Sequence, residues 1–522
     1  MNRLRVLLPW VIGVVGASCV LAAVDFEAKP LSGWPAYAAL CAISAGLIWL
    51  TWRWVVGRKG PRWLAVALGL ALALRMGVGV ALVYALPRFG YDTKPQRAGY
   101  VFFDAYTRDT DAWSLATSDE RLLTAFTEQR RSDQYGGLLF LSALTYRLFS
   151  PEVHRPLLIV LISALISSLA VMFTWGFARL CLGQRASIIG AWIVALYPDA
   201  ILLGASQMRE PFIGTALAIA FYGYAFIRRG LFKQGLVSIL GSTVILVLPV
   251  SPPFAFAILG VVGLAWLWEV QRMSKRHLWL LLLLAIVALV AIFLIIRAWS
   301  TIENLNGSGI GVLLEWWKSA GAQWQRNLLW MQSDWFRRLF RTTPTWAHLP
   351  LVVVYGLMRP FLPAAIIDHG APLWRAIAVW RGLGWVALLP FLLYAPLSSL
   401  RKSGWRDLST YLAFVVWLTA LLASYRGAGD QWDNPRYRTV FLVVQAVVTG
   451  WAWVHARESR SPWLWRTIFM VGISITLFTI WYSERYHWLP YFNVMHAAAV
   501  VGGFVVLFLG GSILLDMIQA RR

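Results

Sequence analysis

The chain has 522 residues, of which 59% are hydrophobic and 14% are charged, and its mean hydropathy is +0.63. A water-soluble fold of this length cannot hide so much apolar surface in one core, so lipid is the main solvent. The 47 Lys and Arg exceed the 24 Asp and Glu and give a net charge of +23. These basic residues are dispersed between apolar runs and form no single stripe, which argues against a nucleic-acid partner.

Apolar runs long enough to cross a bilayer recur along the whole chain and predict an all-α, polytopic transmembrane helical bundle of about 14 spans. We expect its extracytoplasmic loops to carry interfacial helices. In chain order the predicted spans cover residues 6–24, 34–56, 63–86, 156–180, 187–203, 211–227, 235–250, 254–270, 278–299, 378–400, 408–424, 439–455, 464–481 and 492–516. Prolines interrupt the stretch 348–367 three times, so we predict that it is re-entrant or interfacial and does not cross.

The short loops are basic, and basic short loops stay in the cytoplasm. If Arg3 and Arg5 are cytoplasmic, strict alternation places all the short basic loops on the same side, provided that 348–367 does not cross. Their basic residues are Arg58, Lys59, Arg62, Arg185, Arg228, Arg229, Lys233, Arg272, Lys275, Arg276, Arg401, Lys402, Arg406, Arg457, Arg460, Arg521 and Arg522. We therefore predict a multi-pass plasma-membrane protein whose N- and C-termini are both cytoplasmic.

These predictions divide the chain into four parts. They are an N-terminal pair of spans (1–60), a core (61–300) with an acidic outer loop (87–136), an extracytoplasmic amphipathic and re-entrant segment (301–377), and C-terminal spans (378–522). The amphipathic part of the third region, residues 312–341, sets five tryptophans against basic residues and predicts an interfacial helix. The connections predicted on the extracytoplasmic face are 87–155, 204–210, 300–377 and 425–438.

The first outer loop carries the candidate catalytic residues Asp104, Asp109 and Asp111, beside Arg108. Carboxylates so placed can take a proton from an acceptor hydroxyl or hold a divalent cation against a phosphate. An ordinary hydrophilic loop with an Asp helix cap is the alternative. The residue pattern does not establish a metal site, and a divalent cation stays an open alternative to no cofactor.

An apolar stretch too short to span, residues 138–149, follows Tyr135 and is predicted to lie along the outer interface as a helix. Arg209 and Glu210 stand at the next membrane boundary, where Glu210 either serves a site or caps a helix before Pro211.

A late outer loop ends in Arg436, Tyr437 and Arg438 at the membrane edge. Two arginines flanking a tyrosine suit a lipid phosphate, because a guanidinium forks around phosphate oxygens. Interfacial anchoring is the alternative. Arg75 lies inside a predicted span, where an unpaired cation is costly, so we expect it to pair with an acidic partner or to line a cavity.

Nucleotide and common hydrolase motifs are absent: the sequence contains no P-loop, no Rossmann glycine pattern, no HExxH and no GxSxG. Nucleotide hydrolysis and the usual protease and esterase chemistries therefore lose support.

In this order, the features resemble the polytopic glycosyltransferases of the GT-C type, which include protein mannosyltransferases and the aminoarabinose transferases of lipid A. The resemblance covers roughly residues 100–455. It lies in the acidic loop 109–116, the interfacial helix 135–149, Tyr197-Pro198 with Glu210 downstream, the Pro-rich segment 359–363 and the segment 436–438.

The resemblance implies inverting transfer of a sugar from a polyprenyl-phosphate donor to a lipid, glycan or protein acceptor at the extracytoplasmic face, among membrane lipids and without nucleic acid. It implies that Asp109 is the base, with Asp111 and Asp104 as second choices, and that Arg436, Arg438 and Arg209 stabilise the departing phosphate. Rival interpretations are a lipid-linked saccharide flippase or other transporter, and a polysaccharide polymerase or ligase.

Overall fold

The computed structural model describes residues 2–25, 32–127, 132–269, 337, 340–427, 432–484 and 494–521. Within these ranges the regular structure is entirely helical, which confirms the predicted all-α class. The helices are α1 (Asn2–Ala23), α2 (Trp34–Val55), α3 (Arg62–Phe89), α4 (Lys94–Arg97), α5 (Phe103–Thr117), α6 (Thr124–Thr127), α7 (Gly137–Phe149), α8 (Pro156–Cys181), α9 (Gln184–Leu196), α10 (Pro198–Gly204), α11 (Glu210–Arg228), α12 (Phe232–Gly241), the π-helix η1 (Ser242–Val247), α13 (Pro252–Glu269), α17 (Thr345–Met358), α18 (Leu362–Ile367), α19 (Pro372–Ser403), α20 (Leu408–Arg426), α21 (Arg436–Thr439), α22 (Leu442–Glu458), α23 (Pro462–Ser483) and α24 (Val494–Ala520).

Nine helices in the described part of the chain are long and apolar enough to cross a membrane, and the bent pair α9–α10 makes a tenth candidate. The predicted spans 6–24, 235–250 and 439–455 correspond to α1, to α12 with η1, and to α22. The predicted span 278–299 lies outside the described residues, and so does the amphipathic segment 312–341 apart from 337, 340 and 341. A polytopic helical membrane protein is therefore confirmed, and the total of about 14 spans stays a prediction.

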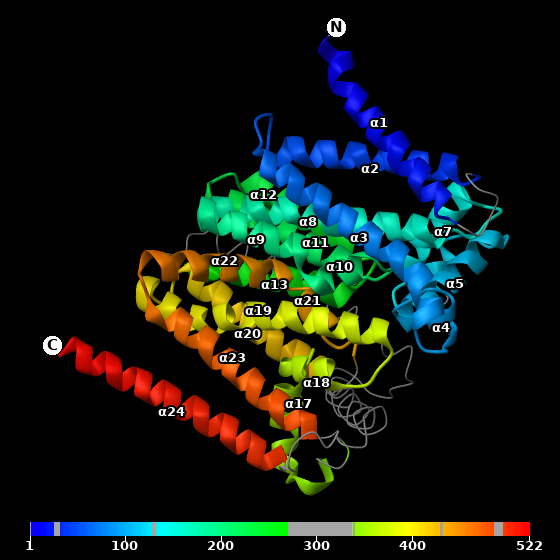
Figure 1. The fold of residues 1–522 in the computed structure, drawn as a ribbon. Coiled ribbons are helices and arrows are strands. Elements are labelled where there is room, and N and C mark those ends of the chain that lie inside the picture. Colours follow the sequence, from blue (N-terminus) through cyan, green and yellow to red (C-terminus); the bar gives the residue numbers. More distant parts are fainter. Residues whose placement is uncertain are drawn as a thin grey trace, which may run out of the picture.

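The helices run side by side, with α8, α9, α11 and α22 near the middle (Figure 1). The short connections α8–α9, α11–α12, α19–α20 and α22–α23 lie at one end of the bundle, on the left in Figure 1. Helices α4, α5 and α7 lie at the opposite end. The charge pattern predicts this separation of short basic loops from the acidic loop, while the assignment of either end to the cytoplasm stays a prediction.

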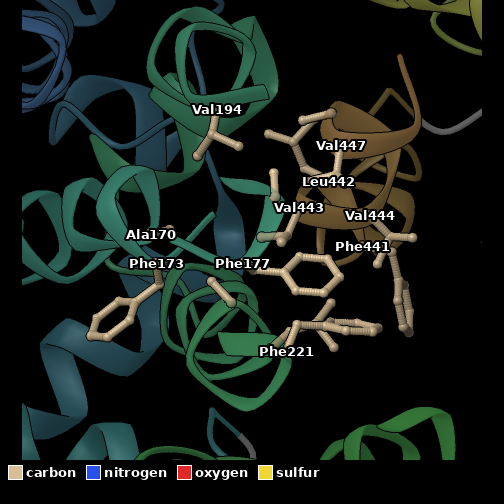
Figure 2. Packing of buried hydrophobic residues seen from close by; sticks show 14 of the residues in the cluster. Ala170, Phe173, Phe177, Val194, Phe221, Phe441, Leu442, Val443, Val444 and Val447 are labelled. Atoms are coloured by element: carbon tan, nitrogen blue, oxygen red, sulfur yellow. The ribbon is translucent and has the colours of Figure 1, made fainter. Parts of the chain in front are cut away.

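The middle of the bundle is packed by side chains from four helices (Figure 2). Phe177 of α8 and Phe221 of α11 have ring centroids 4.9 Å apart, and the α22 side chains Leu442 and Val443 lie beside them. Between α9 and α22 the backbones approach closely, because a Cβ added at Gly450 would lie 2.5 Å from the carbonyl oxygen of Ala186. Small residues at such crossings permit the close packing that holds helices together in lipid.

The span predicted over 187–203 is broken by Pro198, and α9 and α10 meet at an angle of 51°. Pro198 has no N–H to offer the carbonyl of Val194. Arg75, which is fully buried, donates to Val194 at 2.9 Å and to Ala195 at 3.1 Å, as well as to Ser167 Oγ at 2.8 Å. The partners of Arg75 are thus backbone carbonyls and a hydroxyl, and no acidic partner was needed because the broken helix end supplies partial negative charge. Arg75 also lines a cavity of about 40 Å³, which confirms the prediction that it lines a cavity.

The Pro-rich stretch 348–367 is not one continuous helix. Helix α17 ends at Met358 and α18 begins at Leu362, so one of the three predicted interruptions, at Pro360, is present. The other two are absent, because Pro350 lies inside α17 and Pro363 lies in the first turn of α18, where a proline is tolerated. Helix α17 packs against α20, and α18 packs against α19 and α23.

Candidate functional site

Helix α5 presents its acidic residues on two different sides. At roughly 100° per residue, Asp104 and Asp109 lie about 140° apart around the helix axis. Asp104 faces the chain segments that carry Glu210 and Arg436, whereas Asp109 faces α7 and the segment before α8. The three carboxylates of the first outer loop therefore do not form one cluster.

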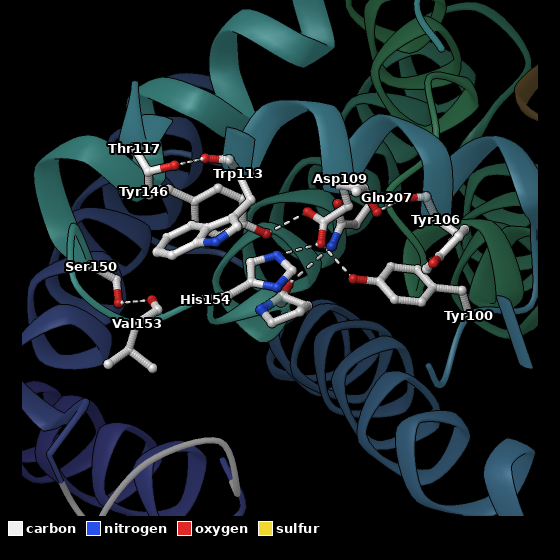
Figure 3. Close-up of polar contacts among 12 residues, drawn as sticks. Tyr100, Tyr106, Asp109, Trp113, Thr117, Tyr146, Ser150, Val153, His154 and Gln207 are labelled. Carbon is white, nitrogen blue, oxygen red and sulfur yellow. Dashed lines mark hydrogen bonds and ion pairs between the residues drawn. The ribbon is translucent and has the colours of Figure 1, made fainter. Parts of the chain in front are cut away.

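Asp109 is completely buried, and both of its oxygens accept hydrogen bonds (Figure 3). The hydroxyls of Tyr100 and Tyr146 bond to it, and His154 Nε2 lies 2.8 Å from its Oδ2. Burial first, and then the Asp109 charge, raises the pKa of Tyr146 well above its usual range, so its hydroxyl stays a donor to the carboxylate. An acceptor substrate has no direct access to Asp109 in this arrangement.

Asp104 is an accessible carboxylate of the loop, with 43% of its side chain exposed. Arg436 Nη1 lies 2.8 Å from Asp104 Oδ2 and 3.5 Å from Asp433 Oδ2, and Arg436 Nε lies 3.7 Å from Glu210 Oε1. We call these four residues the Arg436 cluster. It joins α5, the start of α11 and the start of α21, which are far apart in the sequence.

The electrostatics of the Arg436 cluster favour a charged guanidinium. Burial disfavours the charge of Arg436, but Glu210 and the other nearby anionic groups outweigh burial, so the net effect raises the pKa of Arg436 above its usual range. Glu210 Oε2 is buried and has no hydrogen-bond partner among the described residues. Glu210 also stands in the first turn of α11 before Pro211, so its capping position and its place in the cluster coincide.

Two further guanidiniums converge beside the cluster. Arg209 lies over the ring of Tyr135, with its Cζ 5.8 Å from the ring centroid, and Arg426 lies over the ring of Tyr437 at 5.6 Å. Burial raises the pKa of Tyr135, and the positive charges of Arg209 and Arg426 both oppose that rise. Both arginines are therefore near Tyr135. Neither forms an ion pair with a carboxylate in the described part of the chain.

The buried ion pair Arg108–Asp133 lies next to Tyr135, whose backbone N–H donates to Asp133 Oδ1 at 3.3 Å. Arg108 donates from Nη1 to the Gln207 carbonyl at 2.9 Å, and its Nε lies 3.8 Å from Asp133 Oδ2. Asp133 in turn accepts from the backbone N–H of Leu139 at 3.1 Å, at the start of α7. Burial lowers the pKa of Arg108, and Asp133 opposes this. These contacts tie α5, α7 and the segment before α11 together.

Of the remaining predicted residues, Asp111 and Arg438 lie apart from the Arg436 cluster, and Tyr437 contacts it. Asp111 accepts a hydrogen bond from Ser132. Arg438 is buried, with its guanidinium 3.4 Å from the centroid of the Trp385 ring, and donates to the carbonyls of Leu357 at 3.2 Å and Arg359 at 2.7 Å. It thus binds the end of α17, while Tyr437 turns toward Arg436, whose Nη2 lies 3.3 Å from its hydroxyl.

Sequence reasoning missed Arg426, Asp433 and His154. Arg426 and Asp433 lie in the same late outer loop as Arg436, but no spacing rule distinguishes them from interfacial anchors. His154 is one of seven scattered histidines, and only the fold brings it to Asp109. In the described ranges, no three His, Cys, Asp or Glu side chains are placed to hold a metal ion.

No family model matches the chain, and no curated protein matches it. Among solved structures, the chain is similar to the archaeal oligosaccharyltransferase AglB from Archaeoglobus fulgidus, which was solved in complex with an inhibitory peptide and a dolichol-phosphate. The sequence identity is 14% and the TM-score is 0.38, and the match covers 87% of this chain and 55% of that chain. The chain thus spans about half the length of that protein.

Proposed function

We propose that this chain is a membrane glycosyltransferase of the GT-C type, which transfers a sugar from a polyprenyl-phosphate donor to an acceptor at the extracytoplasmic face. One observation carries the proposal. An accessible carboxylate, Asp104, is ion-paired with Arg436 beside two guanidiniums, Arg209 and Arg426, that have no carboxylate partner among the described residues. A base next to uncommitted cations suits the transfer of a group from a phosphate leaving group.

The proposed reaction assigns a role to each part. Asp104 takes the proton of an acceptor hydroxyl or amine while that oxygen or nitrogen attacks the anomeric carbon. The bond between the anomeric carbon and the phosphate oxygen breaks, and the polyprenyl phosphate leaves with the electron pair. Arg209 and Arg426 bind the phosphate, because guanidiniums pair strongly with phosphate oxygens. Arg436, with Glu210 and Asp433, orients Asp104.

This assignment changes the candidate base. The resemblance favours Asp109 as the base, but Tyr100, Tyr146 and His154 surround its carboxylate. We therefore assign Asp109 a structural role in the first outer loop. Asp111 and Arg438 receive no role in the reaction, because their hydrogen bonds hold Ser132 and the end of α17. The rings of Tyr135 and Tyr437 pack against Arg209 and Arg426, the two arginines that we assign to the phosphate.

The lipid-phosphate donor is supported by where the cluster lies. Asp104, Arg209 and Arg436 all stand at helix ends next to apolar helices, at the end of the bundle that holds α5 (Figure 1). A donor whose phosphate is carried on a prenyl chain can reach such a position from the bilayer, and the chain carries no nucleotide motif that would serve a soluble donor.

Reconstitution in vesicles tests the function against its transporter alternative. The purified chain is supplied with polyprenyl-phosphate sugar, radiolabelled in the sugar, and with acceptor pools of membrane lipid, glycan and protein. We expect the label to change its covalent partner, and Asp104→Asn to stop this change. Label that moves between leaflets without leaving the prenyl phosphate would contradict the proposal and favour a flippase.

A further inference from the structure

A buried ion pair that the proposed reaction does not use lies next to the Arg436 cluster. Arg381 of α19 and Asp199 of α10 are 3% and 2% exposed, and Arg381 Nε donates to Asp199 Oδ1. Asp199 Oδ2 is buried and has no partner in the described part of the chain. Removing such a pair from water costs several kcal/mol per ion, roughly, so a charged pair inside a helical bundle calls for a specific role.

The second contact of Arg381 reaches the late outer loop. Its Nη1 donates to the backbone carbonyl of Trp432 at 2.8 Å, and its guanidinium lies 5.3 Å from the centroid of the Trp432 ring. Trp432 stands immediately before Asp433 and four residues before Arg436. The ion pair Arg381–Asp199 therefore fixes the segment that carries Asp433 and Arg436 of the cluster.

The Trp432 ring also holds the start of α5. It stacks on Phe102 with a centroid distance of 5.1 Å and an interplanar angle of 21°. It also packs edge to face with Trp374, with ring centroids 4.6 Å apart. Phe102 is buried and precedes Asp104 by two residues. The indole of Trp432 thus contacts the chain two residues before Asp104 and belongs to the same loop as Arg436.

We propose that Arg381, held in place by Asp199, positions Trp432 and thereby sets the separation of Asp104 and Arg436 during transfer. Arg381 is a positioning residue under this proposal, which rests on the proposed function. A planar guanidinium can bond to Asp199 and to the Trp432 carbonyl in fixed directions at the same time, whereas a lysine ammonium is a point charge on a flexible stem.

The chain contains a matched control. Arg155 is likewise buried, donates from Nη1 to Asp25 and donates from Nη2 to Ser32 Oγ at 2.8 Å. Both ion pairs join a guanidinium to an Asp and to one further oxygen, with side chains at most 4% exposed. Within the described ranges, the side-chain hydrogen bonds of Arg155 go to the connection between α1 and α2, and they do not involve the Arg436 cluster or Trp432.

The first test compares kinetics and stability. For Arg381→Lys and Trp432→Ala we expect kcat to fall about 10- to 100-fold with little change in the donor KM, because a misplaced base slows the chemical step. Trp432→Phe keeps the backbone carbonyl and a ring on Phe102, and should recover most of the rate. Arg155→Lys should lower the unfolding midpoint by as much as Arg381→Lys while keeping kcat. Equal kcat losses in Arg381→Lys and Arg155→Lys at equal stability would overturn the positioning role.

The second test does not need activity. In an Arg436→Lys background, a carbodiimide joins the lysine to Asp104 as an amide when the two are in contact, and mass spectrometry identifies the linked peptides. We expect the link to form in this background, and also when Arg155→Met is added as the control. We expect the link to be lost when either Trp432→Ala or Arg381→Met is added. A link that persists in both of the latter overturns the proposal. If the link is lost as expected but the parent chain transfers no sugar, the proposed function is wrong. The positioning of Asp104 and Arg436 by Arg381 and Trp432 would still hold.

Discussion

At the scale of single residues, exposure separates Asp104 from Asp109 on α5. Asp104 has 43% of its side chain exposed and one strong partner, Arg436, whereas Asp109 is fully enclosed by three donors. A general base must reach the proton that it takes, so geometry favours Asp104 for the chemistry and leaves Asp109 a structural part.

Replacing Asp104 by Asn should lower transfer by about 10²- to 10⁴-fold, which is the usual contribution of a positioned base, while the unfolding midpoint stays close to that of the parent chain. Asp109→Asn should behave in the opposite way and lower the unfolding midpoint, because one of its buried donors loses a charged acceptor. Transfer assays beside heat unfolding in detergent measure both. Full transfer in Asp104→Asn would sink the assignment of the base.

We expect the affinity for the donor phosphate to depend on Arg209 and Arg426. Removing one charge-assisted hydrogen bond costs roughly 1.5–3 kcal/mol, so Arg426→Gln should weaken binding of polyprenyl phosphate by about 10- to 100-fold. The control is Arg438→Gln, which should lower stability through the lost contacts to α17 and leave phosphate binding in the remaining folded protein unchanged. Competition between polyprenyl phosphate and labelled donor provides the measurement. Equal weakening in both variants would contradict the assignment.

The cation among Asp104, Glu210 and Asp433 is a guanidinium, so we expect a chelator to leave transfer unchanged. Activity is measured after dialysis against EDTA and again after adding back Mg²⁺ or Mn²⁺. Transfer that disappears with EDTA and returns with the metal would contradict the proposed charge balance at the cluster.

At the scale of elements, the break between α9 and α10 shows how a costly membrane arginine is accommodated. Arg75 binds two carbonyls at the end of α9, one of which lost its helical donor to Pro198. The bent pair then carries Asp199 to Arg381, so the same break that Arg75 stabilises also supports the late outer loop.

Replacing Arg75 by Met should leave these two buried carbonyls without donors and lower the free energy of unfolding by about 2–6 kcal/mol, at roughly 1–3 kcal/mol each. Adding Pro198→Ala to Arg75→Met restores an N–H opposite Val194 and should recover part of the loss. Arg53→Met, at an exposed position, serves as the control and should change little. Unfolding midpoints in detergent measure all of them. An unchanged midpoint in Arg75→Met would show that the cap contributes no stability.

At the scale of the whole molecule, short basic connections and the acidic loop occupy opposite ends of the bundle (Figure 1). The proposed reaction at the extracytoplasmic face depends on which end faces the cytoplasm. A single cysteine placed at each end decides this in a background that lacks Cys19, Cys41 and Cys181.

We expect a membrane-impermeant maleimide to label Leu123→Cys in intact cells, because Leu123 is 64% exposed beside α5, at the end that we place outside. Lys59→Cys, in the exposed connection between α2 and α3, should be labelled only after the membrane is permeabilised. The reverse pattern would place the Arg436 cluster on the cytoplasmic side and contradict the proposed face.

The sequence by itself determined the class of the protein and the position of most helices. Long apolar runs have no stable place except lipid, and a helix in lipid must satisfy its own backbone, so composition and length suffice to predict spans. Prolines were informative between Met358 and Leu362, where the sequence predicts an interruption, whereas the break at Pro198 inside the predicted span 187–203 became visible only in the structure.

Only the tertiary structure decided which polar residues meet. Asp104 and Asp109 read alike in the chain, but their angular separation around α5 directs one to Arg436 and the other to His154. Arg436 and Arg438 also read alike, and α21 directs one to the cluster and the other to α17. Pairing of this kind depends on contacts between residues that are 45 to 332 positions apart, which no local pattern encodes. Arg381, Asp199 and Trp432 became visible for the same reason.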